Sequence, residues 1–496
     1  MSFKRASGIL LHPTSLPGPD GIGDLGPEAY HWLDFLAESE CHLWQVLPLG
    51  PTGFGDSPYQ CFSAFAGNPY LISPTLLLDQ DLLTRMDFKD RPVFPSNKVD
   101  FGSAINWKLT LLDRAFDHFI SGTFIELKKG YKTFCDKNIG WLEDFALFMA
   151  IKESQGGISW DNWPADLRSH KLEALKVFKS NNQDAVEKHK LRQYLFHLQW
   201  TTLHEYAASK DIQIIGDIPI FVAYDSADAW AHPELFYLDN TGKPTVVAGV
   251  PPDYFSPTGQ LWGNPLYRWD VHQKEDYTWW VNRLNSVLKD VDIVRLDHFR
   301  GFAGYWEIPA GMPTAEIGRW AKGPGQPFFD AIKKQLGSLP IIAEDLGAIT
   351  PDVVKLRDDN HFPGMKILQF SFSASPEDPF LPHNYSNNCV AYTGTHDNDT
   401  TLGWYLSATE KEQDFYRRYL QRSGDNVAWD FIRAVWSSVA LFSICPLQDL
   451  LNLDTNARMN YPGKPSGNWS WRFLSEQLQH SLSDQLKEIN FLYSRG

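Results

Sequence analysis

Short apolar runs recur along the chain, and most of them end in a polar residue, a glycine or a proline. Strands that are buried on both faces of a parallel sheet give continuous apolar runs of this length. Several runs are separated by stretches with helical periodicity, such as residues 27–40. Eight parallel strands that alternate with helices form a (β/α)8 barrel, so we predict an α/β protein with a TIM-barrel core. The eight runs are GILLH from residue 8, LWQVLPLG from 43, IQIIGDIPIFV from 212, DIVRLDHF from 292, PIIAEDLG from 340, MKILQFSF from 365, CVAYTGTHD from 389 and LFSICPLQDLL from 441.

Long stretches between these runs predict large helical and loop insertions in the barrel. A bare barrel needs roughly 250 residues, whereas this chain has 496, enough for two or three domains as well. Residues of about 53–205 contain helical patterns between the second and third runs. A second insertion, at about 225–285, contains the Gly/Pro-rich segment GVPPDYFSPTGQLWGNPLY at 249–267. We expect a single decorated barrel over residues 1–496, with segment 249–267 covering the substrate at its mouth.

Acidic residues stand at the ends of four of the predicted strands. The third run ends with Asp217, the fourth with Asp297, the fifth with Glu344, and the seventh is followed by His396 and Asp397. Barrel enzymes carry their catalytic groups on the C-terminal ends of the strands. We therefore expect these side chains to converge on one pocket.

The stretch VRLDHFRGF at 294–302 indicates how such carboxyls can differ in protonation. Arg295 lies two residues before Asp297, so in a strand both side chains project from the same face. This arginine can keep Asp297 ionised while a more buried Glu344 stays protonated. One ionised and one protonated carboxyl is the pair that cleavage of a glycosidic bond requires. A structural ion-pair network and a divalent-metal site are the alternatives, although no His-rich strand end favours a metal.

Composition narrows the classes of ligand. Aromatic residues make up 14% of the chain, with 19 Trp, and aromatic rings are good platforms for the C–H faces of sugars. A net charge of −15 disfavours nucleic acids and anionic membranes as partners. Five scattered cysteines fit a reducing compartment, and the N-terminal residues lack the apolar core of a secretion signal. We expect a cytoplasmic protein without a metal or other cofactor.

The segments VRLDHFRGF, IIAEDLG and YTGTHDNDT, in this order, resemble the catalytic segments of the α-amylase superfamily of barrels. The resemblance is closest to the 4-α-glucanotransferase branch, the amylomaltases or disproportionating enzymes, and it runs from about residue 5 to 475. It also includes RASGILLHPTSLPG, GFGDSPYQCFSAFAGNPYLI, GDIPIFVAYDSADAWAHPELF, segment 249–267 and RMNYPGKPSGNWSWR at 458–472. Many α-amylases carry an Asn-His pair after the third strand, and its absence after Asp217 agrees with this branch.

This resemblance implies transfer of α-1,4-glucan segments from a donor maltooligosaccharide, starch or glycogen chain to an acceptor glucan or glucose. The reaction would be a retaining double displacement through a covalent glucosyl-aspartate. Asp297 would be the nucleophile, Glu344 the general acid and base, and Asp397 the third carboxylate, which stabilises the transition state.

The same resemblance implies a set of substrate-binding residues around the three acids. Arg295 would tune Asp297, and Tyr59 would stack beneath the reacting sugar ring. The other members would bind or orient sugar hydroxyls or cover the substrate, and they are Asp217, His396, Asp253, Phe255, Gln260 and Trp262. An amylase-like hydrolase on the same barrel and a non-catalytic glucan-binding barrel remain the rival interpretations.

Overall fold

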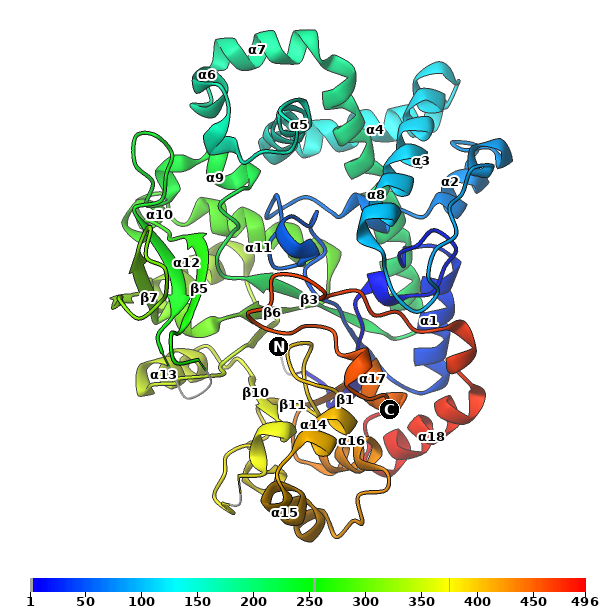
Figure 1. The fold of residues 1–496 in the computed structure, drawn as a ribbon, viewed down its shortest axis with the longest axis vertical. Helices are drawn as coiled ribbons and strands as arrows, with labels where there is room; N and C mark the ends of the chain where they lie inside the picture. Colours follow the sequence, from blue (N-terminus) through cyan, green and yellow to red (C-terminus); the bar gives the residue numbers. More distant parts are fainter. Residues whose placement is uncertain (1–2, 253–255, 374) are drawn as a thin grey trace.

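Eight parallel strands form the central sheet of the computed structural model, which describes residues 3–252, 256–373 and 375–496 (Figure 1). The strand order is β10-β11-β12-β1-β2-β3-β6-β9. The two end strands are joined by one main-chain bond, in which Ala343 N donates to Pro363 O at 2.9 Å. Each strand overlaps one of the eight apolar runs, and the eight-stranded parallel sheet confirms the predicted barrel. The strands are β1 (Ala6–Leu10), β2 (Leu43–Gln45), β3 (Gln213–Pro219), β6 (Ile293–Asp297), β9 (Ile341–Ala343), β10 (Gly364–Ile367), β11 (Cys389–Tyr392) and β12 (Phe442–Pro446).

Alternation along the strands decides which side chains point into the barrel. Ile215, Ile293 and Ile342 belong to one buried cluster with residues of β2, β10, β11 and β12. Their neighbours Ile214 and Val294 pack instead into the larger core that includes the surrounding helices. Because successive side chains of a strand alternate between faces, the residues two and four positions after the inner isoleucines also face the barrel interior. This places the acidic strand ends inside the mouth.

Helices cover the outer face of the barrel, and several of them pack against it through an apolar stripe. Helix α1 buries Ala29, Trp32, Leu33 and Leu36, which recur at the spacing of one helix face. The helices are α1 (Pro27–Glu38), α2 (Pro74–Asp79), α3 (Phe101–Ser121), α4 (Ile125–Lys137), α5 (Ile139–Ser154), α6 (Ala165–Arg168), α7 (Leu172–Asn181), α8 (Gln183–Ser209), α9 (Ala227–Ala231), α10 (Trp269–Lys274), α11 (Thr278–Asp290), α12 (Gln326–Leu336), α13 (Pro351–Asp359), α14 (Thr401–Ser407), α15 (Glu410–Leu420), α16 (Val427–Ser437), α17 (Leu447–Leu450) and α18 (His480–Leu492). Across the described residues, no helix is long and apolar enough to cross a membrane.

The chain between β2 and β3 contains helices α2 to α8, which Figure 1 shows together at one end of the molecule. The longest of them, α8, has 27 residues, and its buried side chains are not confined to one face. It carries apolar groups all round because it packs both against the barrel helix α1 and against α3, α4 and α5 of the insertion.

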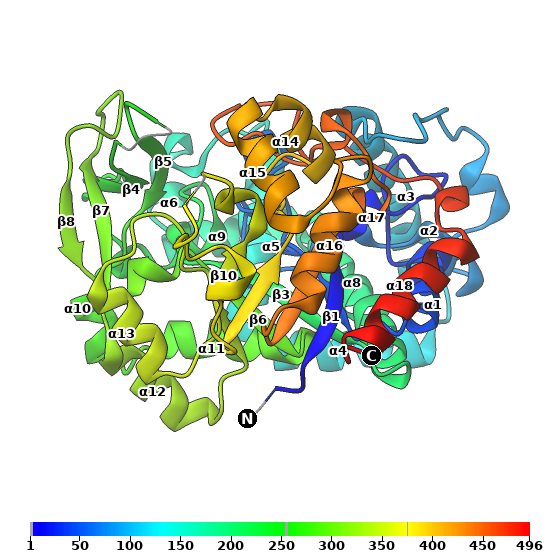
Figure 2. The same cartoon turned by 90° about the horizontal axis from the view of Figure 1, so that it is seen from below.

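A second, antiparallel sheet is formed by two strands that follow the third barrel strand and two that follow the fourth. It has the order β5-β4-β7-β8 and consists of β4 (Val246–Val250), β5 (Gln260–Pro265), β7 (Gly304–Pro309) and β8 (Arg319–Lys322). Figure 2 shows it at one side of the barrel, away from α14 to α16. Segment 249–267 is therefore part loop and part edge strand, since β5 lies within it. Glycines and prolines interrupt its apolar pattern, which is why the strand is hidden in the sequence.

The chain ahead of α18, drawn in red in Figure 1, crosses the barrel face. Buried Arg472 anchors it, since its guanidinium donates to Leu16 O at 3.1 Å and Gly18 O at 2.9 Å. The main chain adds a bond of 2.7 Å from Val99 N to Ser470 O. This segment is therefore fixed to the loops that follow the first strands.

Candidate active site

Arg295 of β6 lies between two carboxyl groups at the mouth of the barrel. Its Nη1 donates to Asp217 Oδ2 at 2.7 Å, and its Nη2 pairs with Asp297 Oδ1 at 2.9 Å. The register of β3 with β6 sets Asp217 beside Arg295, and the spacing of two residues sets Asp297 on the same face. The side chain of Asp217 is 0% exposed, whereas that of Asp297 is 28% exposed. Asp297 is thus the member of this group that a substrate can reach.

Burial and neighbouring charges have opposite effects on the pKa values of Asp217 and Arg295. Burial raises the pKa of Asp217 to about 7, although Arg295 opposes the rise. Burial alone would lower the pKa of Arg295, but Asp217 and Asp297 hold it well above its usual value. The guanidinium is therefore a permanent cation, and it makes a charge-assisted contact of 2.9 Å with Asp297.

Glu344 follows β9 and has no cation in contact with it among the described residues. Its Oε2 accepts from His298 N at 2.8 Å, and its Oε1 accepts from Leu346 N at 3.2 Å. Burial and, to a smaller extent, the charge of Asp297 together raise the pKa of Glu344 to about 8. At neutral pH, Glu344 is therefore protonated and can donate a proton, and it lies beside the carboxyl group that Arg295 pairs with.

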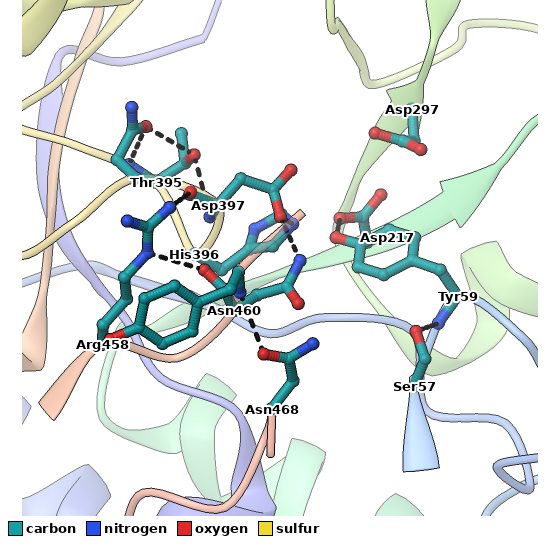
Figure 3. Close-up of polar contacts among 12 residues, drawn as sticks. Ser57, Tyr59, Asp217, Asp297, Thr395, His396, Asp397, Arg458, Asn460 and Asn468 are labelled. Carbon is teal, nitrogen blue, oxygen red and sulfur yellow. Dashed lines mark hydrogen bonds and ion pairs between the residues drawn. The ribbon is translucent and has the colours of Figure 1, made fainter. Parts of the chain in front are cut away.

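Asp397 lies on the opposite wall, in the loop after β11 (Figure 3). Its Oδ1 accepts from Asn460 Nδ2 at 2.7 Å, and its main-chain oxygen accepts from Arg458 Nη2 at 2.7 Å. Its side chain is 51% exposed and lies 3.4 Å from His396 Nε2. Burial lowers the pKa of His396, so the imidazole is neutral at pH 7. Asp397 is held in place without being neutralised, which leaves its carboxylate open to the cleft.

An aromatic stack separates the two walls. Tyr59 lies parallel to the His396 ring at 5.2 Å between centroids, and Trp469 packs against both rings at 6.0 and 5.8 Å. The Tyr59 hydroxyl donates to Asp217 Oδ2 at 2.8 Å. This bond joins the stack to the Arg295 group, and Figure 3 shows the Tyr59 ring next to Asp217.

The edge strand β5 supplies two of the expected substrate-binding residues. Trp262 Nε1 donates to Gln260 Oε1 at 3.1 Å, and the Trp262 ring meets His298 edge-on at 4.8 Å. These contacts place Trp262 next to the residue that follows Asp297. Asp253 and Phe255, which are also expected to bind substrate, lie outside the described residues.

The structure adds residues that the sequence reasoning did not assign. Arg458, Asn460 and Trp469 all lie in the segment 458–472, whose likeness to the glucanotransferases was visible without indicating a role. A cluster of Asn, Arg and Trp in a Gly/Pro-rich segment was the available signal. Nothing in that signal shows which strand end the segment would cover.

Comparison with known proteins agrees with this geometry. Residues 11–477 match the family model for 4-alpha-glucanotransferase. A 4-alpha-glucanotransferase of Thermus thermophilus is 52% identical over 497 residues, covering 99% of this chain and 99% of that protein. One from Synechocystis sp. is 49% identical over 499 residues, covering 100% of this chain and 99% of that protein. The solved amylomaltase from Streptococcus agalactiae in complex with acarbose has a TM-score of 0.97 at 41% identity, covering 99% of this chain and 100% of that one. By these matches, the chain belongs to the 4-alpha-glucanotransferase family of enzymes that act on α-1,4-glucans.

Proposed function

We propose that the chain transfers α-1,4-glucan segments by a retaining double displacement at Asp297, Glu344 and Asp397. The observation that carries this assignment is the contrast between the two carboxyls at the mouth. Asp297 is paired with Arg295 at 2.9 Å, whereas among the described residues Glu344 accepts hydrogen bonds only from neutral main-chain donors. A nucleophile and a proton donor are the two groups that a retaining mechanism requires.

In the first step, Asp297 attacks the anomeric carbon of the donor while the glycosidic bond breaks. Glu344 gives its proton to the leaving oxygen, and a glucosyl ester forms on Asp297. In the second step, Glu344 takes a proton from the 4-hydroxyl of an acceptor sugar. That oxygen attacks the anomeric carbon, and Asp297 is released as a carboxylate. Both steps use the same two carboxyls, in agreement with microscopic reversibility.

The remaining site residues have supporting roles in this proposal. The exposed Asp397 carboxylate binds sugar hydroxyls and stabilises the positive charge that develops in the transition state. Tyr59, braced by His396 and Asp217, offers a ring face to the reacting sugar. Arg295 holds the Asp297 carboxyl in place through the ion pair of 2.9 Å.

Transfer exceeds hydrolysis, we propose, because the substrate-covering segment excludes water from the glucosyl ester while an acceptor binds. Trp262 lies beside His298, close to the nucleophile, in support of this role. Trp262→Ala and Phe255→Ala should therefore raise the ratio of hydrolysis to transfer. An unchanged ratio in folded variants would remove this explanation.

The first experiment is incubation with maltotriose alone, followed by separation of the products by chain length. Glucose with a ladder of longer maltooligosaccharides, at constant total reducing ends, indicates transfer. Rising reducing ends with only glucose and maltose would make the protein a hydrolase. Intact folded protein with no products would favour the non-catalytic glucan-binding barrel.

Asp297→Asn and Glu344→Gln test the residue roles in the same assay. Loss of a nucleophile or of a general acid lowers the rate by about 10²-fold or more. Both variants should keep the unfolding midpoint of the parent within a few degrees. Substantial turnover by either variant would overturn its assigned role.

A cytoplasmic location is also part of the proposal. All five cysteines are unpaired, which is the state that a reducing compartment maintains. Cell fractionation with an antibody against the chain tests the location, and recovery of the protein outside the cytoplasm would contradict it.

A further inference from the structure

His298 has an unusual backbone conformation directly after the nucleophile. Its φ and ψ are 52° and 48°, in the left-handed region that a residue with a Cβ adopts at a cost. This conformation turns its N–H toward Glu344 Oε2 at 2.8 Å. Two main-chain bonds extend the connection, from Phe299 N to Glu344 O and from Glu344 N to Leu296 O, each at 3.0 Å. The turn after β6 is therefore built around Glu344.

The His298 side chain has a different neighbour. Its ring meets the edge of Trp262 at 4.8 Å and an angle of 84°, with Phe221 at 6.5 Å on another side. Gly301 closes the space below, because a Cβ at that position would lie 3.3 Å from His298 Cδ2. The ring is thus enclosed by packing, and its position depends on where Trp262 stands.

Trp262 itself belongs to an edge strand. β5 pairs only with β4, and its first residues, Gln260 and Leu261, are exposed. Edge strands of this kind have fewer contacts to hold them than central strands. A glucan that contacts the Trp262 indole can therefore change the contact between Trp262 and His298.

We propose that His298 is a positioning residue that transmits the placement of Trp262 by substrate to the carboxyl group of Glu344. The inference rests on the proposed role of Glu344 as general acid and base. When Trp262 is seated, its contact holds the imidazole and keeps the turn left-handed, so the His298 N–H stays directed at Glu344. When Trp262 is displaced, the turn relaxes toward ordinary backbone angles and Glu344 loses this hydrogen bond.

The charges around Glu344 and His298 decide in which direction the pKa of Glu344 changes when the hydrogen bond between them is lost. Glu344 faces Asp297, Arg295 and Asp345, and the His298 ring faces Asp297 and Arg300. Burial lowers the pKa of His298 to about 4, so the imidazole is neutral at neutral and alkaline pH. A hydrogen bond from His298 N to Glu344 favours the ionised carboxyl and lowers the pKa of Glu344. Loss of that bond should therefore move the alkaline limb of the pH–rate profile to higher pH.

The test separates the backbone of His298 from its ring. His298→Ala removes the ring and disfavours the left-handed turn, whereas His298→Gly removes the ring but allows the turn freely. With maltotriose as substrate, His298→Ala should lower kcat by on the order of tenfold to a hundredfold at nearly constant KM, the cost of a misplaced catalytic group. The alkaline limb of the pH–rate profile of His298→Ala should move to higher pH. His298→Gly should restore most of kcat and the original limb.

The deciding comparison adds Trp262→Ala in both backgrounds. In the parent, Trp262→Ala should move the alkaline limb upward in addition to raising KM. In the His298→Gly background, the same replacement should raise KM without moving the limb, because the ring that transmits the change is absent. Equal limb shifts in both backgrounds, or no shift in either, would overturn the inference. If His298→Ala does not fold, this comparison still decides the question.

Glu344→Gln distinguishes failure of the inference from failure of the proposed function. An active Glu344→Gln variant with an unchanged alkaline limb would refute the general-acid role itself. An inactive Glu344→Gln variant, together with His298 and Trp262 variants that leave the limb in place, would refute only the coupling.

Discussion

Arg295→Met tests the electrostatics of the site quantitatively. Arg295 lies 2.7 Å from the fully buried carboxyl of Asp217 and 2.9 Å from Asp297. At an effective dielectric constant of about 20, each contact contributes a gross attraction of roughly 6 kcal/mol. Most of this attraction offsets the cost of removing the ions from water. Removing one partner of such a pair leaves an uncompensated buried charge, and we therefore expect a loss of about 3–5 kcal/mol in unfolding free energy.

The assay is urea unfolding followed by tryptophan fluorescence, for the parent, Arg295→Met, Asp217→Asn and the double variant. The double variant should recover about 1–3 kcal/mol relative to the sum of the single changes, because it has no unpaired carboxylate.

The loss of unfolding free energy in Arg295→Met should depend on pH in one direction. Burial already raises the pKa of Asp217 to about 7, and loss of Arg295 raises it further. Folding then takes up a proton, so the stability deficit of Arg295→Met should be small near pH 4 and grow as the pH rises through 7. A deficit below about 1 kcal/mol, or one that does not change with pH, would refute the assigned charge pairing.

Further predictions concern the neighbouring residues. Activity should fall as the pH rises through about 8, because Glu344 must carry a proton to act as an acid, and kcat/KM measured from pH 5 to 10 checks this. Glu344→Gln should be more stable than the parent at pH 8 and gain nothing near pH 4, because between these values the folded parent holds Glu344 protonated while the unfolded chain ionises it; urea midpoints at both pH values test this. Asn460→Ala should lower kcat about tenfold with little effect on folding, as expected for loss of a bond that orients a catalytic carboxylate, and a parent-like kcat would exclude that role for the 2.7 Å contact with Asp397. Trp469→Ala should cost about 3–5 kcal/mol as a buried large-to-small change, and a smaller loss in thermal or urea unfolding would show that the stack with Tyr59 is not needed for stability.

The sequence predicts the barrel and the acidic strand ends for a simple physical reason. Parallel strands buried on both faces leave continuous apolar runs, and their C-terminal ends meet at one rim. Asp217, Asp297 and Glu344 lie two or four positions after an inward-facing isoleucine. Because strand side chains alternate with a period of two, this even spacing already sets their direction. Arg295 follows from the same rule.

Other parts of the site depend on chain segments without a repeating pattern. Asn460 and Asp397 are separated by 63 positions, and the contact between them depends on how an irregular segment crosses the barrel. The left-handed angles of His298 are not encoded by a glycine, because packing around the ring stabilises them. Strand β5 is interrupted by Gly263, whose φ of 78° breaks the alternation that marks a strand. These features follow from tertiary contacts, which the local pattern does not specify.

One cation decides how the two reacting carboxyls divide their roles. Asp297 and Glu344 stand close enough for the charge of one to raise the pKa of the other, so without further help both would compete for a proton. Arg295 breaks this symmetry because it projects from the same strand face as Asp297 and donates to it, while Glu344 receives only main-chain N–H groups. In the proposed mechanism, the nucleophile is therefore specified by a spacing of two residues in β6, and the acid by its lack of contact with that arginine. Arg295→Lys keeps the charge but should weaken the difference between the two carboxyls. A single ammonium cannot reproduce the planar guanidinium, which makes both the 2.7 Å contact with Asp217 and the 2.9 Å contact with Asp297. The kcat of Arg295→Lys should fall because Asp297 is no longer held in a fixed orientation, and an unchanged kcat would show that the charge alone, without the two-pronged geometry, is enough.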